Sequence, residues 1–202
     1  MQPPRAAIAY TLHGNCYVNL TNHCSLRCGF CPKFNKQWEV QGYSLRLAAE
    51  PSAEEVIAAI GDPARYVEVV FCGLGEPTLR LSCLSTVARK LHAQGVRVRL
   101  NTDGLANWLY GRDVSAELAE YIDAISISLN AQNAEVYNRH CRPPVSQAYQ
   151  QLHDFIRCAR RYIPDITLTA IDGLAGVDIP ACAEIAQHYG VKFRRRELDK
   201  VG

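Results

Sequence analysis

The stretch Cys24-Ser-Leu-Arg-Cys28-Gly-Phe-Cys31 places three cysteines within eight residues, with three residues between the first two and two between the last two. A loop this short holds three thiols close together. A closed structural zinc site takes four ligands, and an ordinary electron-transfer iron–sulfur cluster takes four protein thiolates. Three cysteines therefore predict a metal site with one open position.

Two kinds of site fit this count. A cubane [4Fe–4S] cluster held by Cys24, Cys28 and Cys31 keeps one iron free to bind a cofactor such as S-adenosylmethionine (SAM) and cleave it reductively. A Zn²⁺ site completed by His23 or His13 is the alternative. The cluster is the sharper hypothesis, because further motifs follow along the chain.

These motifs have their own spacing and order. They are Tyr17-Val-Asn-Leu-Thr-Asn-His23, Phe71-Cys-Gly-Leu-Gly-Glu-Pro-Thr-Leu79, Asn101-Thr-Asp-Gly104, Ser126-Ile-Ser-Leu-Asn-Ala131 and Gly190-Val-Lys-Phe-Arg-Arg195. With the cysteine loop and its aromatic Phe30, they resemble the radical SAM superfamily, most closely the small TatD-associated radical SAM proteins. The resemblance covers nearly the whole chain. Asp103 departs from it, since such a sequence is expected to carry Asn there.

Composition places the chain among ordinary globular proteins. It has 202 residues, 48% of them hydrophobic and 21% charged, with a net charge of +2. We expect one radical SAM core domain over residues 1–202, with no membrane span and no signal peptide. Nine cysteines, an odd number, argue against a secreted disulfide framework and for the reducing cytoplasm. We expect the cysteines outside the loop to be buried small side chains. Ligation of an auxiliary cluster by some of them stays open.

The pattern of apolar residues predicts alternating strands and helices. The predicted strands cover residues 16–21, 66–71, 96–100, 124–129, 166–171 and 191–195. The predicted helices cover 53–60, 81–93, 114–121, 147–162 and 179–189, and residues 33–51 and 139–144 are predicted as loops. Such alternation predicts an α/β fold with a parallel sheet and helices outside. Its six units agree with the partial (βα)6 barrel that the resemblance implies.

Each candidate functional motif directly follows a predicted strand. In barrels of this type the active site forms at the carboxyl ends of the strands. Glycines such as Gly73 and Gly75 let a ligand approach the backbone, and Glu76 with nearby carbonyls suits an ammonium group. The resemblance implies that this motif binds the amino group of SAM. It also implies that Phe30 covers the flank of the cluster and meets the adenine.

Polar residues after other strands complete the predicted site. Ser126, Ser128 and Asn130 alternate and so share one face. The resemblance implies that Ser128 and Asn130 bind the ribose hydroxyls or the carboxylate of SAM. Thr102 lies at the same rim, as a cofactor or substrate contact or a simple turn. Arg142 is a candidate partner for the cofactor carboxylate, or a solvated loop charge.

A basic run ends the chain at Arg194, Arg195 and Arg196. Such a run is usually a solvated face, and it also suits an anionic substrate or nucleic acid. No aromatic residues interleave with it to support nucleic-acid binding.

The resemblance implies an enzyme that cleaves SAM to methionine and a 5′-deoxyadenosyl radical, which abstracts hydrogen from an unidentified substrate. The expected partners are a small-molecule or peptide substrate, an external electron donor such as flavodoxin or ferredoxin, and a second copy or a protein that closes the mouth. Three alternatives stay open: a glycyl-radical-type activase of a partner protein, a peptide or nucleobase tailoring enzyme, and a non-catalytic iron–sulfur or zinc-binding module.

Overall fold

The central element is a curved sheet. A computed structural model describes residues 6–34 and 38–198. Within these residues, one sheet of seven strands has the order β1-β2-β5-β6-β7-β8-β9. Its strands are β1 (Ala9–Leu12), β2 (Asn15–Val18), β5 (Val69–Phe71), β6 (Val98–Thr102), β7 (Ala124–Ser128), β8 (Asp165–Asp172) and β9 (Lys192–Glu197). All neighbours pair in parallel except β1, which runs antiparallel to β2.

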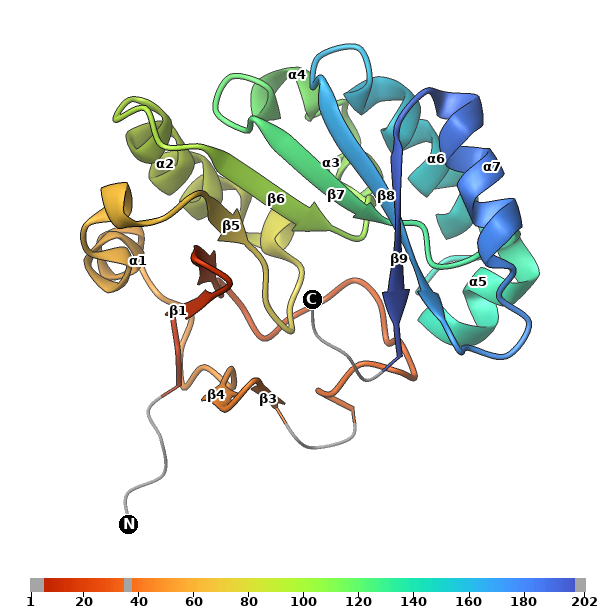
Figure 1. Cartoon of the computed structure of the whole chain (residues 1–202), viewed down its shortest axis with the longest axis horizontal. Coiled ribbons are helices and arrows are strands. Elements are labelled where there is room, and N and C mark those ends of the chain that lie inside the picture. The colour runs from red at the N-terminus through yellow and green to blue at the C-terminus, as the bar shows by residue number, and fades with distance from the viewer. Residues whose placement is uncertain (1–5, 35–37, 199–202) are drawn as a thin grey trace.

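Helices cover the outer side of this sheet (Figure 1). They are α1 (Ala53–Ile60), α2 (Leu81–His92), α3 (Ala106–Tyr110), α4 (Ser115–Leu118), α5 (Ala134–Cys141), α6 (Ala148–Ala159) and α7 (Ile179–Tyr189), with short 3-10 turns at Pro63–Arg65 and Pro77–Arg80. The predicted start of α1 is confirmed: Ser52 and Glu55 form a capping box. At α4 the cap position is Val114, not the predicted Ser115, and no side chain caps the helix; Ser115 N donates to Asp113 Oδ1 (2.8 Å).

The predicted fold class is confirmed, because from β2 onward each strand pairs in parallel with the next strand of the sheet. The parallel part ends at β2 on one side and at β9 on the other, and these two strands do not pair with each other. The sheet is therefore an open, partial barrel, whose inner face is free of helices (Figure 1).

The main error in the predicted elements concerns residues 139–144. Residues 139–141 form the last turn of α5, not a loop. The helix begins at the cap Asn133, whose side chain accepts a hydrogen bond from Val136 N (3.0 Å). It persists because Val136, Tyr137 and Cys141 are buried.

Two further strand pairs were not predicted. β1 forms a hairpin with β2 at the edge of the sheet. The segment predicted as an extended loop contains a small hairpin, β3 (Glu39–Val40) and β4 (Tyr43–Ser44), while residues 35–37 of that prediction lie outside the described residues. Buried Val40 and Leu45 pack with Tyr10 and Leu74, so this hairpin has a small apolar cluster of its own.

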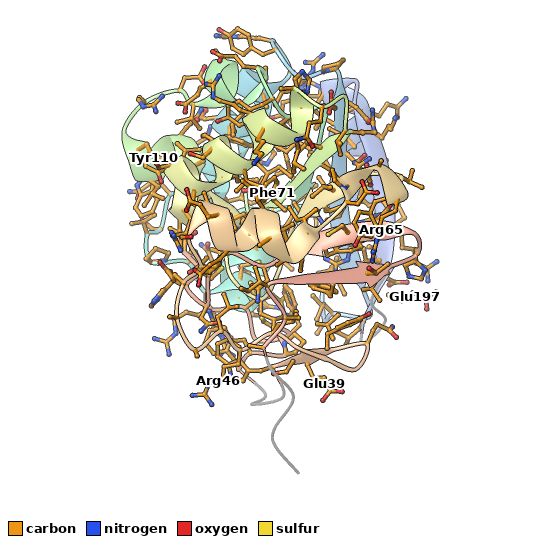
Figure 2. All side chains as sticks on the ribbon, turned by 90° about the vertical axis from the view of Figure 1, so that its left-hand side faces the viewer. Glu39, Arg46, Arg65, Phe71, Tyr110 and Glu197 are labelled. Carbon is orange, nitrogen blue, oxygen red and sulfur yellow. The ribbon has the colours of Figure 1, made fainter. Side chains whose placement is uncertain are left out.

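The main core lies between the sheet and the outer helices, with side chains such as Phe71, Leu100, Ile125 and Phe155 fully buried. Figure 2 shows Phe71 inside the molecule, whereas Glu39 and Arg46 extend from the surface at the end that carries the hairpin. No helix in the described ranges is both long and apolar enough to cross a bilayer.

Candidate functional site

The inner face of the partial barrel encloses a cavity of about 1150 Å³. Because side chains alternate along a strand, every second residue of each strand faces it. Residues from every strand of the curved sheet line the cavity, among them Tyr17, Cys72, Asn101, Ser126, Ser128, Thr167, Thr169, Arg194 and Arg196. The volume is that of a site for a cofactor and a small substrate.

All the predicted site residues except Arg142 line this cavity. They are Cys24, Cys28, Phe30, Cys31, Gly73, Gly75, Glu76, Thr102, Ser126, Ser128 and Asn130. Arg142 is exposed at the end of α5, with its guanidinium against Gly29 on the outside of the cysteine loop. This position gives no support to the predicted contact between Arg142 and the cofactor carboxylate.

The cysteine loop is held by the carboxyl end of α5. Arg27 N donates to Cys141 O (3.0 Å), and Gly29 N donates to His140 O (2.9 Å). The last carbonyls of a helix have no partner within the helix and so are free to accept such bonds. The end of α5, which was predicted as a loop, thus fixes the position of the cysteine loop.

The three thiols of the loop are reduced, partly buried and directed to the same cavity. Burial raises the pKa of Cys24 to about 12 and also raises that of Cys31. The pKa of Cys28 is raised first by a hydrogen bond with Cys141 and then by burial. Neutral thiols are therefore the ligand-free state, and metal binding must displace their protons.

No three His, Cys, Asp or Glu side chains in the described parts of the chain are arranged to hold a metal ion. In a cubane cluster, by contrast, each thiolate binds a different iron, so the three sulfurs need not meet at one point. Soft thiolate ligands are those that iron–sulfur clusters require. The donor set of Cys24, Cys28 and Cys31 fits such a cluster.

Glu76 is a buried carboxylate, with only 3% of its surface exposed. Its Oε1 accepts hydrogen bonds from Thr78 N (3.1 Å), Thr78 Oγ1 (2.8 Å) and Thr102 Oγ1 (2.8 Å), and its Oε2 accepts one from Asp103 N (2.8 Å). Within the described residues, no cationic side chain pairs with it. Burial, and then the charge of Asp103, raise the pKa of Glu76. A cationic ligand would stabilise this carboxylate, because a buried charge needs a partner.

Asp103, the departure from the expected Asn, ties the end of β6 to the cysteine loop. Its carboxylate accepts hydrogen bonds from Ser25 Oγ (2.5 Å) and Leu105 N (3.0 Å). Burial raises its pKa as well. Asp103 therefore adds a second carboxylate beside Glu76, and no cationic side chain of the described residues pairs with either of them.

The glycines of the Glu76 motif have a structural reason that the sequence did not show. A side chain on Gly75 would collide with the backbone carbonyls of Thr21 and His23, and one on Gly73 would collide with Asn19. Glu76 N also donates to His23 O (2.8 Å). The motif thus packs directly against the segment that leads into the cysteine loop. This contact fixes the position of Glu76 relative to the thiols.

The polar residues of β7 lie on the cavity side, as predicted. Ser126 and Asn130 are buried and Ser128 is half-buried. Asn130 has a left-handed backbone (φ 62°), which Asn adopts more readily than most residues, and its Nδ2 contacts Cys141 Sγ (3.4 Å). Asn130 is therefore linked through Cys141 to the cysteine loop, while the serine hydroxyls face the cavity.

Several cavity residues were not predicted as part of the site. Asn101 Oδ1 and Arg196 Nε are buried and have no hydrogen-bond partner among the described residues. Cys72 and Tyr17 also line the cavity. The available signal was the alternation of side chains. Continued one residue beyond the predicted strand ends at 71, 100 and 195, it places residues 72, 101 and 196 on the same face as residues 70, 99 and 194, which also line the cavity. Cys141, predicted as a buried small side chain, is buried but also contacts Asn130.

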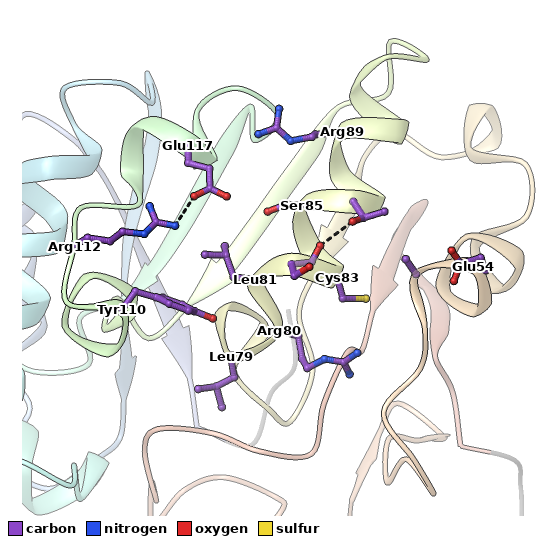
Figure 3. A pocket seen from close by; sticks show the side chains of 13 residues that line it. Glu54, Leu79, Arg80, Leu81, Cys83, Ser85, Arg89, Tyr110, Arg112 and Glu117 are labelled. Carbon is purple, nitrogen blue, oxygen red and sulfur yellow. Dashed lines mark hydrogen bonds and ion pairs between the residues drawn. The ribbon is translucent and has the colours of Figure 1, made fainter.

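A second hollow of about 820 Å³ lies outside the barrel, along α2 (Figure 3). Its arginines already have acidic partners: Arg112 pairs with Glu117 (2.7 Å), Arg89 with Glu120 (2.6 Å) and Arg80 with Glu50 (3.0 Å). None of its lining residues lines the inner cavity, which contains the three thiols and Glu76. We therefore assign the functional site to the inner cavity.

Comparison with solved structures agrees with this architecture. The chain is similar to TYW1 with a bound lysine–pyruvate adduct (TM-score 0.61, 14% identity), covering 94% of this chain and 67% of that one. It is similar to the FeFe-hydrogenase maturase HydG from Carboxydothermus hydrogenoformans (0.62, 19%), covering 93% and 44%. It is also similar to anSMEcpe with bound AdoMet (0.60, 13%), covering 90% and 50%. The chain thus spans about half the length of the last two.

These likenesses, all below 20% identity, concern the fold. No curated protein sequence is significantly similar to the chain. The closer resemblance to the TatD-associated proteins stays a prediction. A family model described as the radical SAM superfamily matches residues 18–188, which is most of the chain. The chain therefore belongs to the radical SAM superfamily of enzymes.

Proposed function

We propose that residues 1–202 form one catalytic core that binds a [4Fe–4S] cluster through Cys24, Cys28 and Cys31 and binds SAM at the same cavity. When bound, these cofactors supply reductive cleavage of the sulfonium and, through it, hydrogen abstraction from a substrate. The protein positions the cofactor, orients the substrate and excludes water.

The observation that carries this proposal is the pairing of three thiols with an uncompensated buried carboxylate in one cavity. Glu76 already accepts hydrogen bonds from Thr78, Thr102 and the backbone of Asp103, so its position is fixed. Its charge still lacks a cation among the described residues. The α-ammonium group of SAM is such a cation, and it would donate hydrogen bonds to Glu76 close to the cysteine loop.

Other cavity residues have roles that follow from their chemistry. Phe30 on the cysteine loop offers an aromatic face to the adenine. Ser128 offers a hydroxyl to the ribose, and Ser126 lies one step deeper on the same face of β7. Asn130 closes this side of the site, and its contact with Cys141 orients it.

The open edge between β2 and β9 would admit a small-molecule or peptide substrate. An external protein such as flavodoxin or ferredoxin would supply the electron. A second copy of the chain or a protein partner would cover the mouth. All nine cysteines are free thiols in the structure. They support a reducing compartment, for which we propose the cytoplasm.

A turnover assay tests the proposal. The chain is reconstituted anaerobically with iron and sulfide, and dithionite and SAM are added. We expect a cluster absorbance band and release of 5′-deoxyadenosine from the wild type and from Cys158→Ala, a cysteine that does not line the cavity, but not from Cys28→Ala. A cluster that never cleaves bound SAM would favour a non-catalytic module. Binding of zinc with no cluster would overturn the proposal.

A further inference from the structure

The arginine run on β9 divides between two faces of the sheet. Arg195 faces away from the cavity and pairs with Asp172 (2.5 Å). Arg194 and Arg196, two residues apart, both line the cavity. The sequence left the run open as a solvated face, an anionic substrate site or a nucleic-acid site. The alternation of the strand assigns only two of the three arginines to the cavity.

Neither cavity arginine has an acidic partner among the described residues. The Nε of Arg196 is buried and has no hydrogen-bond partner within residues 6–34 and 38–198. Burial, the main cause, lowers the pKa of Arg196, which shows that its charge is poorly compensated. Arg99, another cavity arginine, is different, because its Nε lies 2.9 Å from the carboxylate of Glu68. A buried donor without a partner is a costly arrangement that a ligand would relieve.

The two arginines have polar surroundings; Arg196 is half-buried, whereas Arg194 is exposed at the open side of the cavity. Arg196 interacts electrostatically with Cys72, and Arg194 interacts with Tyr17 on the opposite edge of the partial barrel. Asn101 has a buried Oδ1 that accepts no hydrogen bond from the part of the chain that the structure describes. A ligand here would meet two guanidinium groups, a phenol and an amide. Guanidinium groups bind carboxylate and phosphate in a bidentate manner.

We propose that Arg194 and Arg196 form an oxyanion subsite that holds a carboxylate or phosphate group of the substrate at the open side of the cavity. The proposal rests on the proposed function, since it names the class of molecule on which that chemistry acts. The carboxylate of SAM is the second possible source of the same anion. The hydroxyls of β7 are available for that group, which leaves the arginines of β9 to the substrate.

The test measures binding by the reconstituted full-length chain, without turnover. Equilibrium dialysis gives the Kd of SAM, and isothermal titration gives the Kd of inorganic pyrophosphate and of succinate, in the presence of SAM. The variants are Arg196→Gln and Arg194→Gln. Arg195→Gln is the matched control, because it removes a positive charge from the same strand on the opposite face. We expect Arg196→Gln to weaken at least one probe about tenfold or more. Arg194→Gln should weaken it less, and Arg195→Gln should not change it.

The same variants show whether the arginines bind an anionic group of the substrate or the carboxylate of SAM. We expect SAM affinity to change less than about twofold in all three variants. A loss of SAM affinity in Arg196→Gln would overturn the proposal, because the arginine would then serve the cofactor carboxylate. Probes that bind equally to wild type, Arg195→Gln and Arg196→Gln, or that do not bind the wild type, would also overturn it. Failure of SAM to bind the wild type would instead count against the proposed function.

Discussion

The carboxylates at the two ends of the partial barrel have opposite surroundings. At the floor, where the strands begin, Glu68 lies near Arg99 (2.9 Å) and Arg97 (3.5 Å), and Asp165 pairs with Arg97 (2.6 Å) and Lys192 (2.9 Å). At the rim, where the strands end, Glu76 and Asp103 lie side by side. In the described ranges, neither of them has a cationic partner.

The protonation of the two ends differs accordingly. A hydrogen bond from Lys192 is the main cause that lowers the pKa of Asp165, whereas burial raises the pKa of Glu76. Carboxylates that form ion pairs with side chains of the same chain stabilise the fold. Carboxylates without a cationic partner among the described residues mark the end at which we propose that the ammonium group of the cofactor binds.

The largest expected effect concerns ligand binding at the rim. Glu76→Gln keeps the shape of the side chain but removes the charge that would pair with the ammonium group. We expect it to weaken SAM binding about 100-fold, as when one partner of a buried charge pair is lost. Equilibrium dialysis with the reconstituted protein measures this. Glu68→Gln, the same change at the floor, is the control and should leave SAM affinity unchanged. Equal losses in both variants would erase the contrast between rim and floor.

The next largest effect is on folding stability, through the packing that fixes the position of Glu76. Gly75→Ala forces a methyl group against the carbonyls of Thr21 and His23, with an expected loss of about 2 kcal/mol in the free energy of unfolding. Gly29→Ala is the control, because its methyl group would meet only the mobile end of Arg142, 3.3 Å away. Urea unfolding of both variants measures the difference. A stable Gly75→Ala protein would show that the rim is loosely packed.

A smaller effect is expected at the floor. Asp165→Asn leaves Lys192 and Arg97 without their shared carboxylate, and the side chain of Asp165 is 20% exposed. We expect a loss of about 1 kcal/mol in the free energy of unfolding, because partly exposed ion pairs are modest. SAM affinity should not change. Thermal unfolding at low and high salt measures the effect, which should shrink as salt rises.

The finest comparison is the pH dependence of the two carboxylates. The lowered pKa of Asp165 means that its stabilising effect is present at neutral pH and is lost as the pH falls through its folded value. The raised pKa of Glu76 has the opposite sign: ligand-free protein loses stability as the pH rises and the buried charge forms. Carbon-13 NMR titration of the carboxyl groups, assigned with Asp165→Asn and Glu76→Gln, measures both. A Glu76 pKa at or below its ordinary value would contradict the proposed need for a cation.

Much of the fold could be predicted because its signals are local. The buried strands are short apolar runs, and the helices between them carry caps such as Ser52. The parallel order follows from alternation alone. β1 and the β3–β4 hairpin could not be predicted in this way, because strands of two to four residues give almost no periodicity and are stabilised by packing on Tyr10 and Leu74.

The site divides similarly. The cysteine loop and Glu76 could be identified from residue type and spacing. The placement of Arg142 could not, because it depends on α5 ending at Cys141 and turning Arg142 into a left-handed cap against Gly29. Alternation along β9 separates Arg195 from Arg194 and Arg196, but which of the two faces lines the cavity depends on the packing of β9 beside β8. Such positions depend on tertiary contacts, which cannot be inferred from the local patterns of a single sequence.

The hydrogen bonds from the cysteine loop to the end of α5 have a consequence for how the protein is made. The loop emerges early in synthesis, but its anchors, the carbonyls of His140 and Cys141, are synthesised only after four of the parallel strands. Contacts between residues so distant in sequence form late in folding. We therefore expect the thiols to acquire their final arrangement only when most of the sheet exists. On this basis we expect cluster insertion to follow folding, and a chain truncated before α5 to lack a finished site for iron.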